Sequence, residues 1–449
     1  MVKLRVAALS RLLGAVHWTV IRNASSLVGT TLVNLSLGAV YWWLAARWFA
    51  PSALGLASAA ISAMALLGAL GMFGLGTLLI GELQRRPDLR GELVATGLLT
   101  AGLAGCVFGA IFAVFAPSIT TDLQPLASST WSIGLFALGV GLTALTLVLD
   151  QALIGLFRGS LQLWRNALFG LAKLAALAAT GIWWADRHAS TIMATWVAGL
   201  VACLAALTLM TGGIKGHYRP RPELLYGLGW QAIGHHVLNV ALQVSGLAMP
   251  LVVTVLLSTA ANAYYYTAGM VAGLVYIAPT SLAIVLFAVG TAEPAALAQR
   301  VRFTLGLSLA VTLLANGVLL MAASPILSVF GRTYAENGAV PLQLLALGAL
   351  PIIIREHYAA IQRIHGRPVG AAPLVLAGSA LKLILAAKGA SLGGLVGLSM
   401  GLLIAGCIEA LLMAPLVYRA AVGTGAAREK PPAHAVPNVV MSARSNDEL

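Results

Sequence analysis

The chain alternates between long apolar stretches and short polar connections. A helix needs about 20 apolar residues to cross a hydrocarbon core of roughly 30 Å, and each stretch is long enough. Lipid cannot satisfy backbone polar groups, so such spans must be helical. The pattern predicts twelve membrane spans, at residues 25–49, 54–80, 92–116, 131–156, 161–184, 191–211, 227–257, 261–291, 303–330, 339–362, 368–387 and 391–418.

Two pairs of similar segments indicate an internal repeat. Residues 48–60 (WFAPSALGLASAA) join the first two spans, and residues 256–268 (LLSTAANAYYYTA) join the seventh and eighth, 208 residues later. Residues 151–159 (QALIGLFRG) and 358–366 (YAAIQRIHG) correspond at an offset of 207. Two six-span halves of equal orientation predict a parallel repeat about an axis along the membrane normal, with substrate near the interface between the halves.

The fold class that follows is an all-α polytopic membrane protein with two six-helix bundles. The predicted parts are a basic N-terminal segment (1–24), a first bundle (25–211), a linker (212–226), a second bundle (227–418) and a disordered tail (419–449).

Composition and charge support this interpretation and give it an orientation. The residues are 59% hydrophobic and 9% charged, and the mean hydropathy is +0.91, which excludes an ordinary soluble domain. Of the 27 Lys and Arg residues, 20 fall on one side of the predicted membrane and 4 on the other. This bias predicts cytoplasmic termini. It also assigns the net charge of +13 to orientation and lipid headgroups rather than to nucleic acid.

One part of the chain has the pattern of a known family. A first span with Ser, Thr and Asn leads into the turn 50–55 (APSALG). A Gly-rich second span follows, which ends with 71–77 (GMFGLGT) and a basic loop. This order resembles the O-antigen and exopolysaccharide flippases, the polysaccharide-transporter branch of the multidrug/oligosaccharidyl-lipid/polysaccharide exporter superfamily. The resemblance covers about residues 15–420.

The resemblance implies two bundles around a central cavity that moves lipid-linked sugar outward from the cytoplasmic leaflet. It implies a place in the cytoplasmic membrane of a bacterium. The partners would be membrane lipids, a lipid-linked glycan and the polymerase or glycosyltransferases of polysaccharide synthesis. The chain departs from the family in one respect, because strongly charged cavities are common there and its spans hold few charges.

Polar residues recur at every fourth position in the first span and in its counterpart, the seventh. They are Arg22, Ser26, Thr30 and Asn34, and then Gln231, His235, Asn239 and Gln243. Polar groups in hydrocarbon are costly unless they face protein or water. Hydrogen bonding between helices is a competing explanation for Ser26 and Thr30. We expect Asn34, His235, Asn239 and Gln243 to line a hydrated cavity.

Three basic residues inside the spans are candidates for binding an anionic substrate. A guanidinium offers forked donors to phosphate, so Arg355 is the first candidate for holding a pyrophosphate or an acidic sugar. Lys173 and Lys382 occupy nearly matching places in the fifth and eleventh spans and would assist as point charges. The alternative for Lys173 is a structural salt bridge with Asp150.

Three acidic residues inside the spans, Asp150, Glu356 and Glu409, are candidates for ion coupling. Charges inside a membrane mark function by default, and a structural ion pair is the competing explanation for Asp150 and Glu409. Consecutive helical residues point about 100° apart, so Arg355, Glu356 and His357 cannot share one face. At least one of them should pair with a neighbouring helix.

The sequence contains no catalytic motif, nucleotide-binding loop or metal-ligand spacing. We therefore expect neither an enzyme nor a cofactor, and the three cysteines all fall inside predicted spans. Two alternatives to a flippase stay open. One is an ion-coupled exporter of drugs or small metabolites, which would need an acidic cation site in the first bundle. The other is a membrane-embedded enzyme or scaffold of polysaccharide assembly.

Overall fold

A computed structural model describes residues 33–183, 187–210, 219–225, 230–292 and 296–423. In these ranges the regular structure is helical, with no strand. A first helix covers 33–48 of the described chain. The other α-helices are α2 (Pro51–Gly71), α3 (Leu75–Arg85), α4 (Arg90–Phe115), α5 (Thr130–Gly155), α6 (Gly159–Trp183), α7 (Ala189–Met210), α8 (Trp230–Leu256), α9 (Thr259–Ala292), α10 (Leu297–Ser328), α11 (Arg332–Leu347), α12 (Ala349–Ile364) and α13 (Pro368–Val422).

The described part of each predicted span is helical, with three differences. The second span is broken after α2, where Phe73 (φ 44°) and Gly74 (φ 77°) take left-handed backbone angles. The tenth divides at Gly348 into α11 and α12. The last two spans run together as α13, interrupted at Gly393 and Gly394. In the described ranges, nine helical stretches are long and apolar enough to cross a membrane. The chain is a multi-pass membrane protein.

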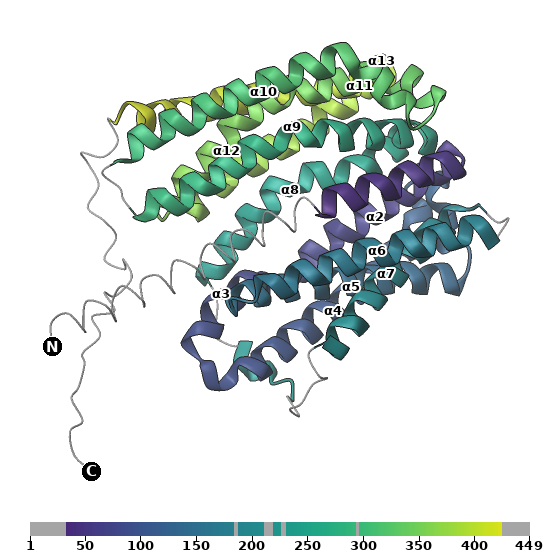
Figure 1. Ribbon diagram of the computed structural model, residues 1–449, viewed down its shortest axis with the longest axis horizontal. Coiled ribbons are helices and arrows are strands. Elements are labelled where there is room, and N and C mark those ends of the chain that lie inside the picture. Colours follow the sequence, from purple (N-terminus) through teal and green to yellow (C-terminus); the bar gives the residue numbers. More distant parts are fainter. Residues whose placement is uncertain (1–32, 184–186, 211–218, 226–229, 293–295, 424–449) are drawn as a thin grey trace, which may run out of the picture.

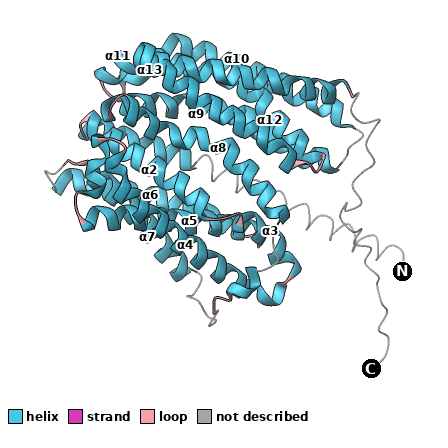
Figure 2. Ribbon diagram, turned by 180° about the vertical axis from the view of Figure 1, so that it is seen from behind, coloured by secondary structure: helices cyan, strands magenta, loops and turns pink. Residues whose placement is uncertain are grey.

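The helices form two halves that lie side by side (Figure 1). The first half holds the helices from 33–48 to α7, and the second holds α8 to α13. Helix α2 lies between them and packs against α8 and α9. Figure 2 shows the same two layers from behind. The two-bundle fold class predicted from the sequence is confirmed.

The first repeat is visible in the backbone hydrogen bonds. The amide of Phe49 donates to the Ala45 carbonyl, and the amide of Leu257 donates to Val253, both over 2.9 Å. These bonds close the two helices that precede α2 and α9. Their separation of 208 residues is the offset that the sequence predicts.

The second repeat lies at a slightly different offset. The amide of Arg158 donates to Leu153 over 2.8 Å, and that of Arg367 donates to Gln362 over 2.9 Å. The two turns are therefore 209 residues apart, two more than the offset of 207 found by aligning the two sequence segments. The left-handed position holds Phe157 (φ 55°) in one turn and a glycine, Gly366 (φ 68°), in the other.

The two halves share an apolar core at one end of the bundle and have separate cores at the other. We call the end with Pro51 and Thr259 the outer end, after the predicted orientation, and the opposite end the inner end. One apolar core spans both halves and includes Trp42 and Met64 of the first half with Val271 of the second. Towards the inner end each half has a core of its own. The first of these lies between α3, α4 and α5, and the second lies between α8, α9, α10, α12 and α13.

Candidate functional site

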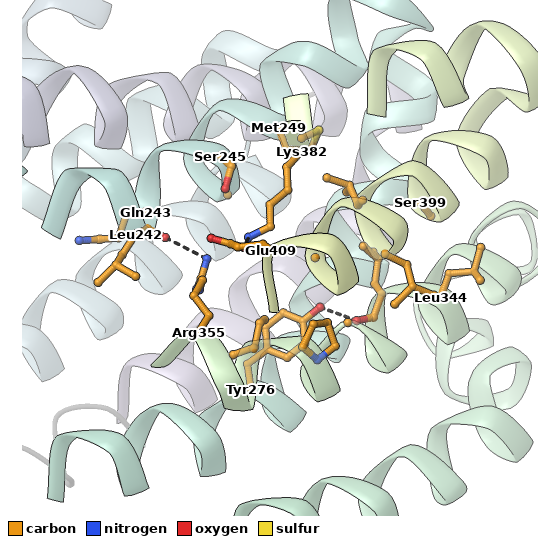
Figure 3. Close-up of a pocket in the computed structure, with 18 of the residues that line it drawn as sticks. Leu242, Gln243, Ser245, Met249, Tyr276, Leu344, Arg355, Lys382, Ser399 and Glu409 are labelled. Carbon is orange, nitrogen blue, oxygen red and sulfur yellow. Dashed lines mark hydrogen bonds and ion pairs between the residues drawn. The ribbon is translucent and has the colours of Figure 1, made fainter. Parts of the chain in front are cut away.

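The second half contains a cavity of about 370 Å³. Its walls come from helices α8, α9, α11 and α12 and from the two arms of α13, the segments before and after the break at Gly393 and Gly394. Most of the lining is apolar, and the polar groups gather in one region (Figure 3). The predicted site residues that line the cavity are Gln243, Arg355, Lys382 and Glu409.

Arg355 and Lys382 reach into this cavity, and each is bound to a carboxylate. Arg355 Nη2 lies 2.8 Å from Glu356 Oε1, and Lys382 Nζ is paired with Glu409. Arg355 Nη1 donates a long hydrogen bond of 3.4 Å to the Leu242 carbonyl. Arg355 Nε has no hydrogen-bond partner in the described part of the chain. The site therefore holds one spare guanidinium donor beside a second cation.

The Lys382–Glu409 pair joins the two arms of α13 across its glycine break. Glu409 is only 2% exposed, and removing its partner would leave a buried charge. Breaking such a pair typically costs about 3–5 kcal/mol, more than its net contribution to stability.

The three consecutive polar residues of α12 have different partners. Arg355 and Glu356 bind each other, while His357 pairs with a neighbouring helix, with Nε2 3.1 Å from Thr304 Oγ1 of α10. One of the three was expected to do so.

The polar face predicted on α8 is only partly at the cavity. The side chain of Gln243 is exposed and points away from Arg355 (Figure 3), and it donates to the Asn239 carbonyl over 3.2 Å. Asn239 Oδ1 accepts a 2.8 Å hydrogen bond from Arg363 of α12. The side chain of His235 lies outside the described residues, as do Ser26 and Thr30.

Asp150 forms a buried polar network in the first half. Its partner is Arg165, with Nη2 2.6 Å from Asp150 Oδ2, so the alternative pairing with Lys173 is wrong. The tight turn after α5 places Arg165 two helical turns into α6, within reach of Asp150. Lys173 lies eight residues further on, a rise of about 12 Å. Asn166 accepts from both Arg165 (2.9 Å) and Asn34 (3.0 Å).

Lys173 lies in the first half, in a cage of aromatic rings. Its Nζ is 3.8 Å from the ring centroid of Trp196, 4.5 Å from Phe169 and 5.1 Å from Tyr41. The residue is 4% exposed and has no carboxylate partner among the described side chains. Each cation–π contact contributes about 0.5–2 kcal/mol, whereas burying an ion costs several kcal/mol. The rings only partly offset the burial of a charge.

Sequence reasoning missed two sets of buried polar residues. Arg165 was counted as an inner-loop charge, yet it is 4% exposed inside α6. The spacing of Gln162 and Asn166 was the available signal, since residues four apart share a helical face. The second set lies on one face of α10, also at every fourth position: Thr304, Ser308, Thr312 and Asn316.

Polar contacts hold the two halves together at the outer end. Asn262 of α9 donates to the Gly55 carbonyl over 2.7 Å and contacts Ser58 Oγ at 3.1 Å. Asp122 Oδ2 accepts from the Thr259 amide over 3.3 Å. These bonds cross from one half to the other beside the shared core, so the outer end is closed.

Two more bonds join the halves there. Trp43 and Arg47, at the end of the first helix, both donate to the Val329 carbonyl, over 3.1 and 2.9 Å.

Comparisons with known proteins give the fold. No family model matches the chain, and no curated protein matches it. An inward-facing multidrug resistance MATE family transporter of the MOP superfamily aligns with a TM-score of 0.69 and 12% identity, over 89% of this chain and 96% of that one. The lipid II flippase MurJ, in an inward closed conformation, aligns with a TM-score of 0.64 and 13% identity, over 88% of this chain and 89% of that one.

The fold is thus that of the transporters of the MOP superfamily. An outward-facing multidrug resistance MATE family transporter of that superfamily aligns with a lower TM-score of 0.56 and 12% identity, over 89% of this chain and 96% of that one.

Proposed function

We propose that the protein flips a lipid-linked oligosaccharide of the polyprenyl-pyrophosphate type across a bacterial cytoplasmic membrane, for cell-surface or exopolysaccharide synthesis. The observation that carries this proposal is Arg355, which lines the cavity beside a second cation, Lys382, and whose Nη1 is held only by a long hydrogen bond of 3.4 Å to the Leu242 carbonyl. The likeness in fold to a lipid II flippase supports it, as does the polysaccharide-transporter pattern of the sequence.

The geometry suits an anionic headgroup that arrives and leaves. A diphosphate oxygen would accept from Arg355 Nη1 and replace its long bond to the Leu242 carbonyl. Lys382 would supply a second positive charge. Glu356 and Glu409 stay paired with the two cations, so the empty site carries no excess charge and the headgroup is held without being trapped.

The closed outer end fits loading from the inner side. With the termini in the cytoplasm, as the basic residues predict, the separate inner ends of the halves face the leaflet in which lipid-linked sugars are assembled. Movement between this state and one open outward is alternating access. Glu356, Glu409 and Asp150 are the acids for ion coupling, and each would have to leave an ion pair to bind an ion.

The test is leaflet exchange in proteoliposomes with short-chain fluorescent polyprenyl-pyrophosphate sugars and an impermeant quencher. We expect Arg355→Ala to slow flipping by about 10- to 100-fold, because a charge-assisted hydrogen bond contributes about 1.5–3 kcal/mol. Arg332→Ala is the matched control, because Arg332 is exposed and binds Glu336 outside the cavity. Wild-type rates in folded Arg355→Ala protein would remove the anion site.

The second candidate function is the ion-coupled export of cationic drugs or metabolites. It is favoured by the MATE likeness but weakened by Asp150, whose carboxylate is already bound to Arg165 in the first half. Transport of a cationic dye under a proton gradient, without any flipping of the lipid-linked sugar, would favour the exporter.

A further inference from the structure

Lys173 is a buried titratable group that the proposed cavity does not use. It lies in the middle of α6, and its backbone packs tightly against α7. A Cβ added at Gly199 would lie 2.8 Å from Lys173 Cβ, so only a glycine there allows this approach. The aromatic cage then encloses the amine with rings from three elements, Tyr41 of the first helix, Phe169 of α6 and Trp196 of α7.

Lys173 differs from its counterpart in the second half. Lys382 is bound to Glu409, so its charge changes only if an ion pair breaks. Lys173 is held by neutral rings, and Asp150, the acid inside a predicted span of its half, is bound to Arg165. Lys173 can therefore lose or gain a proton without breaking an ion pair.

The groups that face Lys173 confirm that no fixed charge compensates it. The first helix contributes the phenol of Tyr41. The thiol of Cys203 on α7, about one turn beyond Gly199, lies near Arg165 instead and donates to the Leu200 carbonyl. On α6 itself Arg165 lies two turns away, bound to Asp150 of α5. The described part of the chain therefore offers no acid to hold a proton on Lys173.

A second cavity leads from the outer end towards the cage. It has a volume of about 380 Å³ and lies between α6 and α7. Hydroxyl groups of Thr180, Ser190, Thr191 and Thr195 line it. Thr195 Oγ1 lies 2.9 Å from the hydroxyl of Tyr41, and the Tyr41 ring forms one wall of the cage. Hydroxyl groups therefore extend from the cavity to Tyr41, whose ring forms one wall of the cage.

The cage also connects to the interface between the halves. The rings of Tyr41 and Trp196 contact Trp42, with centroids 5.4 and 6.1 Å away. Trp42 in turn lies 4.7 Å from Tyr266 of α9, across the interface. A rearrangement of the cage when the ammonium loses its charge would move the rings that pack between the two halves.

We propose that Lys173 is a proton-binding site that couples proton uptake from the outer side to the rearrangement of the two halves. The step is a simple acid–base exchange, in which the ammonium releases one proton to the hydroxyl-lined cavity and the neutral amine takes one back from it. The site lies apart from the cavity of the second half, and it does not depend on the identity of the cargo.

The first test follows the protonation of Lys173 without any substrate. Tryptophan fluorescence of the full-length protein in nanodiscs is recorded against pH, and the contribution of Trp196 is isolated by difference with Trp196→Phe. We expect a titration step in the wild type that is absent from Lys173→Met, which has no amine, and from Lys173→Arg, which stays charged. A wild-type curve identical to that of Lys173→Arg would overturn the proposal.

The second test links the site to transport. Initial rates of flipping of the fluorescent polyprenyl-pyrophosphate sugar are compared with and without an inward proton gradient. We expect the gradient to accelerate the wild type and Lys388→Met, an exposed-lysine control, whereas the ratio of rates for Lys173→Met falls to about 1. Gradient-dependent transport by Lys173→Met would overturn the coupling. Failure of wild-type flipping would count against the proposed function, and the fluorescence titration would still decide the lysine site.

Discussion

The closest approach of the two halves is at Gly55, and an alanine there should open the outer end. A Cβ at this position would lie 2.6 Å from the carbonyl carbon of Thr259, closer still to its oxygen, and 3.0 Å from the amide of Ala263. These are backbone atoms of α9 and cannot rotate away. Because carbon atoms pack at about 3.5–4.0 Å, α2 and α9 would have to separate by roughly 1 Å.

The cost of this separation follows from the bonds that it breaks. Asn262 donates to the Gly55 carbonyl and contacts Ser58, and two such bonds contribute about 2 kcal/mol. Overpacking adds about 1–3 kcal/mol. A penalty of about 3 kcal/mol or more, borne only by the closed state, changes the ratio of closed to open molecules by roughly 100-fold. Asn262→Ala should produce a smaller shift, because it loses the hydrogen bonds alone.

The assay is a spin-label distance measurement across the outer end, in a background without the native cysteines. Ser118→Cys and Asn337→Cys place labels on exposed positions of the two halves. We expect Gly55→Ala to increase the population of longer distances. Gly269→Ala is the control, because a Cβ at Gly269 of α9 meets nothing within 4 Å. An unchanged distance distribution in folded Gly55→Ala protein would refute the role of this contact in closure.

Three further predictions concern stability, measured by thermal unfolding in detergent. Lys382→Met should destabilise the protein by about 3–5 kcal/mol, because it leaves buried Glu409 unpaired. Adding Glu409→Leu to the same chain should restore most of this loss. If the effects of the two substitutions simply add, the two residues do not form an ion pair. Asp150→Asn should destabilise through Arg165 in the same way, whereas Lys173→Met should change the stability by the same amount with and without Asp150→Asn. Phe157→Gly should stabilise by about 1–2 kcal/mol because it relieves a left-handed backbone, and Gly366→Ala should destabilise at the matching turn; a loss of stability in Phe157→Gly would show that ring packing dominates there.

The sequence predicts the fold well because hydropathy acts locally and strongly. Each span is identified by its own apolar residues, and the repeat supplies the two-bundle arrangement. The breaks inside spans are a different matter, since Phe73 is an apolar residue and hydropathy gives no sign that its φ is positive. The division at Gly348 is hidden in the same way within an apolar stretch.

The candidate site was predictable in its residue types but not in its pairings. Arg355, Lys382 and Glu409 were identified as rare charges inside spans, and they share one cavity. Which acid binds which base depends on the phase and depth of neighbouring helices, and one turn of helix decides it. Arg165 and Asp150 meet for this reason, although Arg165, near the start of the predicted span 161–184, was counted only as a charge of the inner side.

The core shared by the two halves has a consequence for the work done in each cycle. Opening the outer end must pull apart packed side chains such as Trp42 and Tyr266, whereas the inner ends already have separate cores. For a carrier that loads from the inner side, the cargo-free ground state is then the receptive one. The outward stroke would require the input of energy, and the return would run downhill, so that an emptied carrier resets by itself.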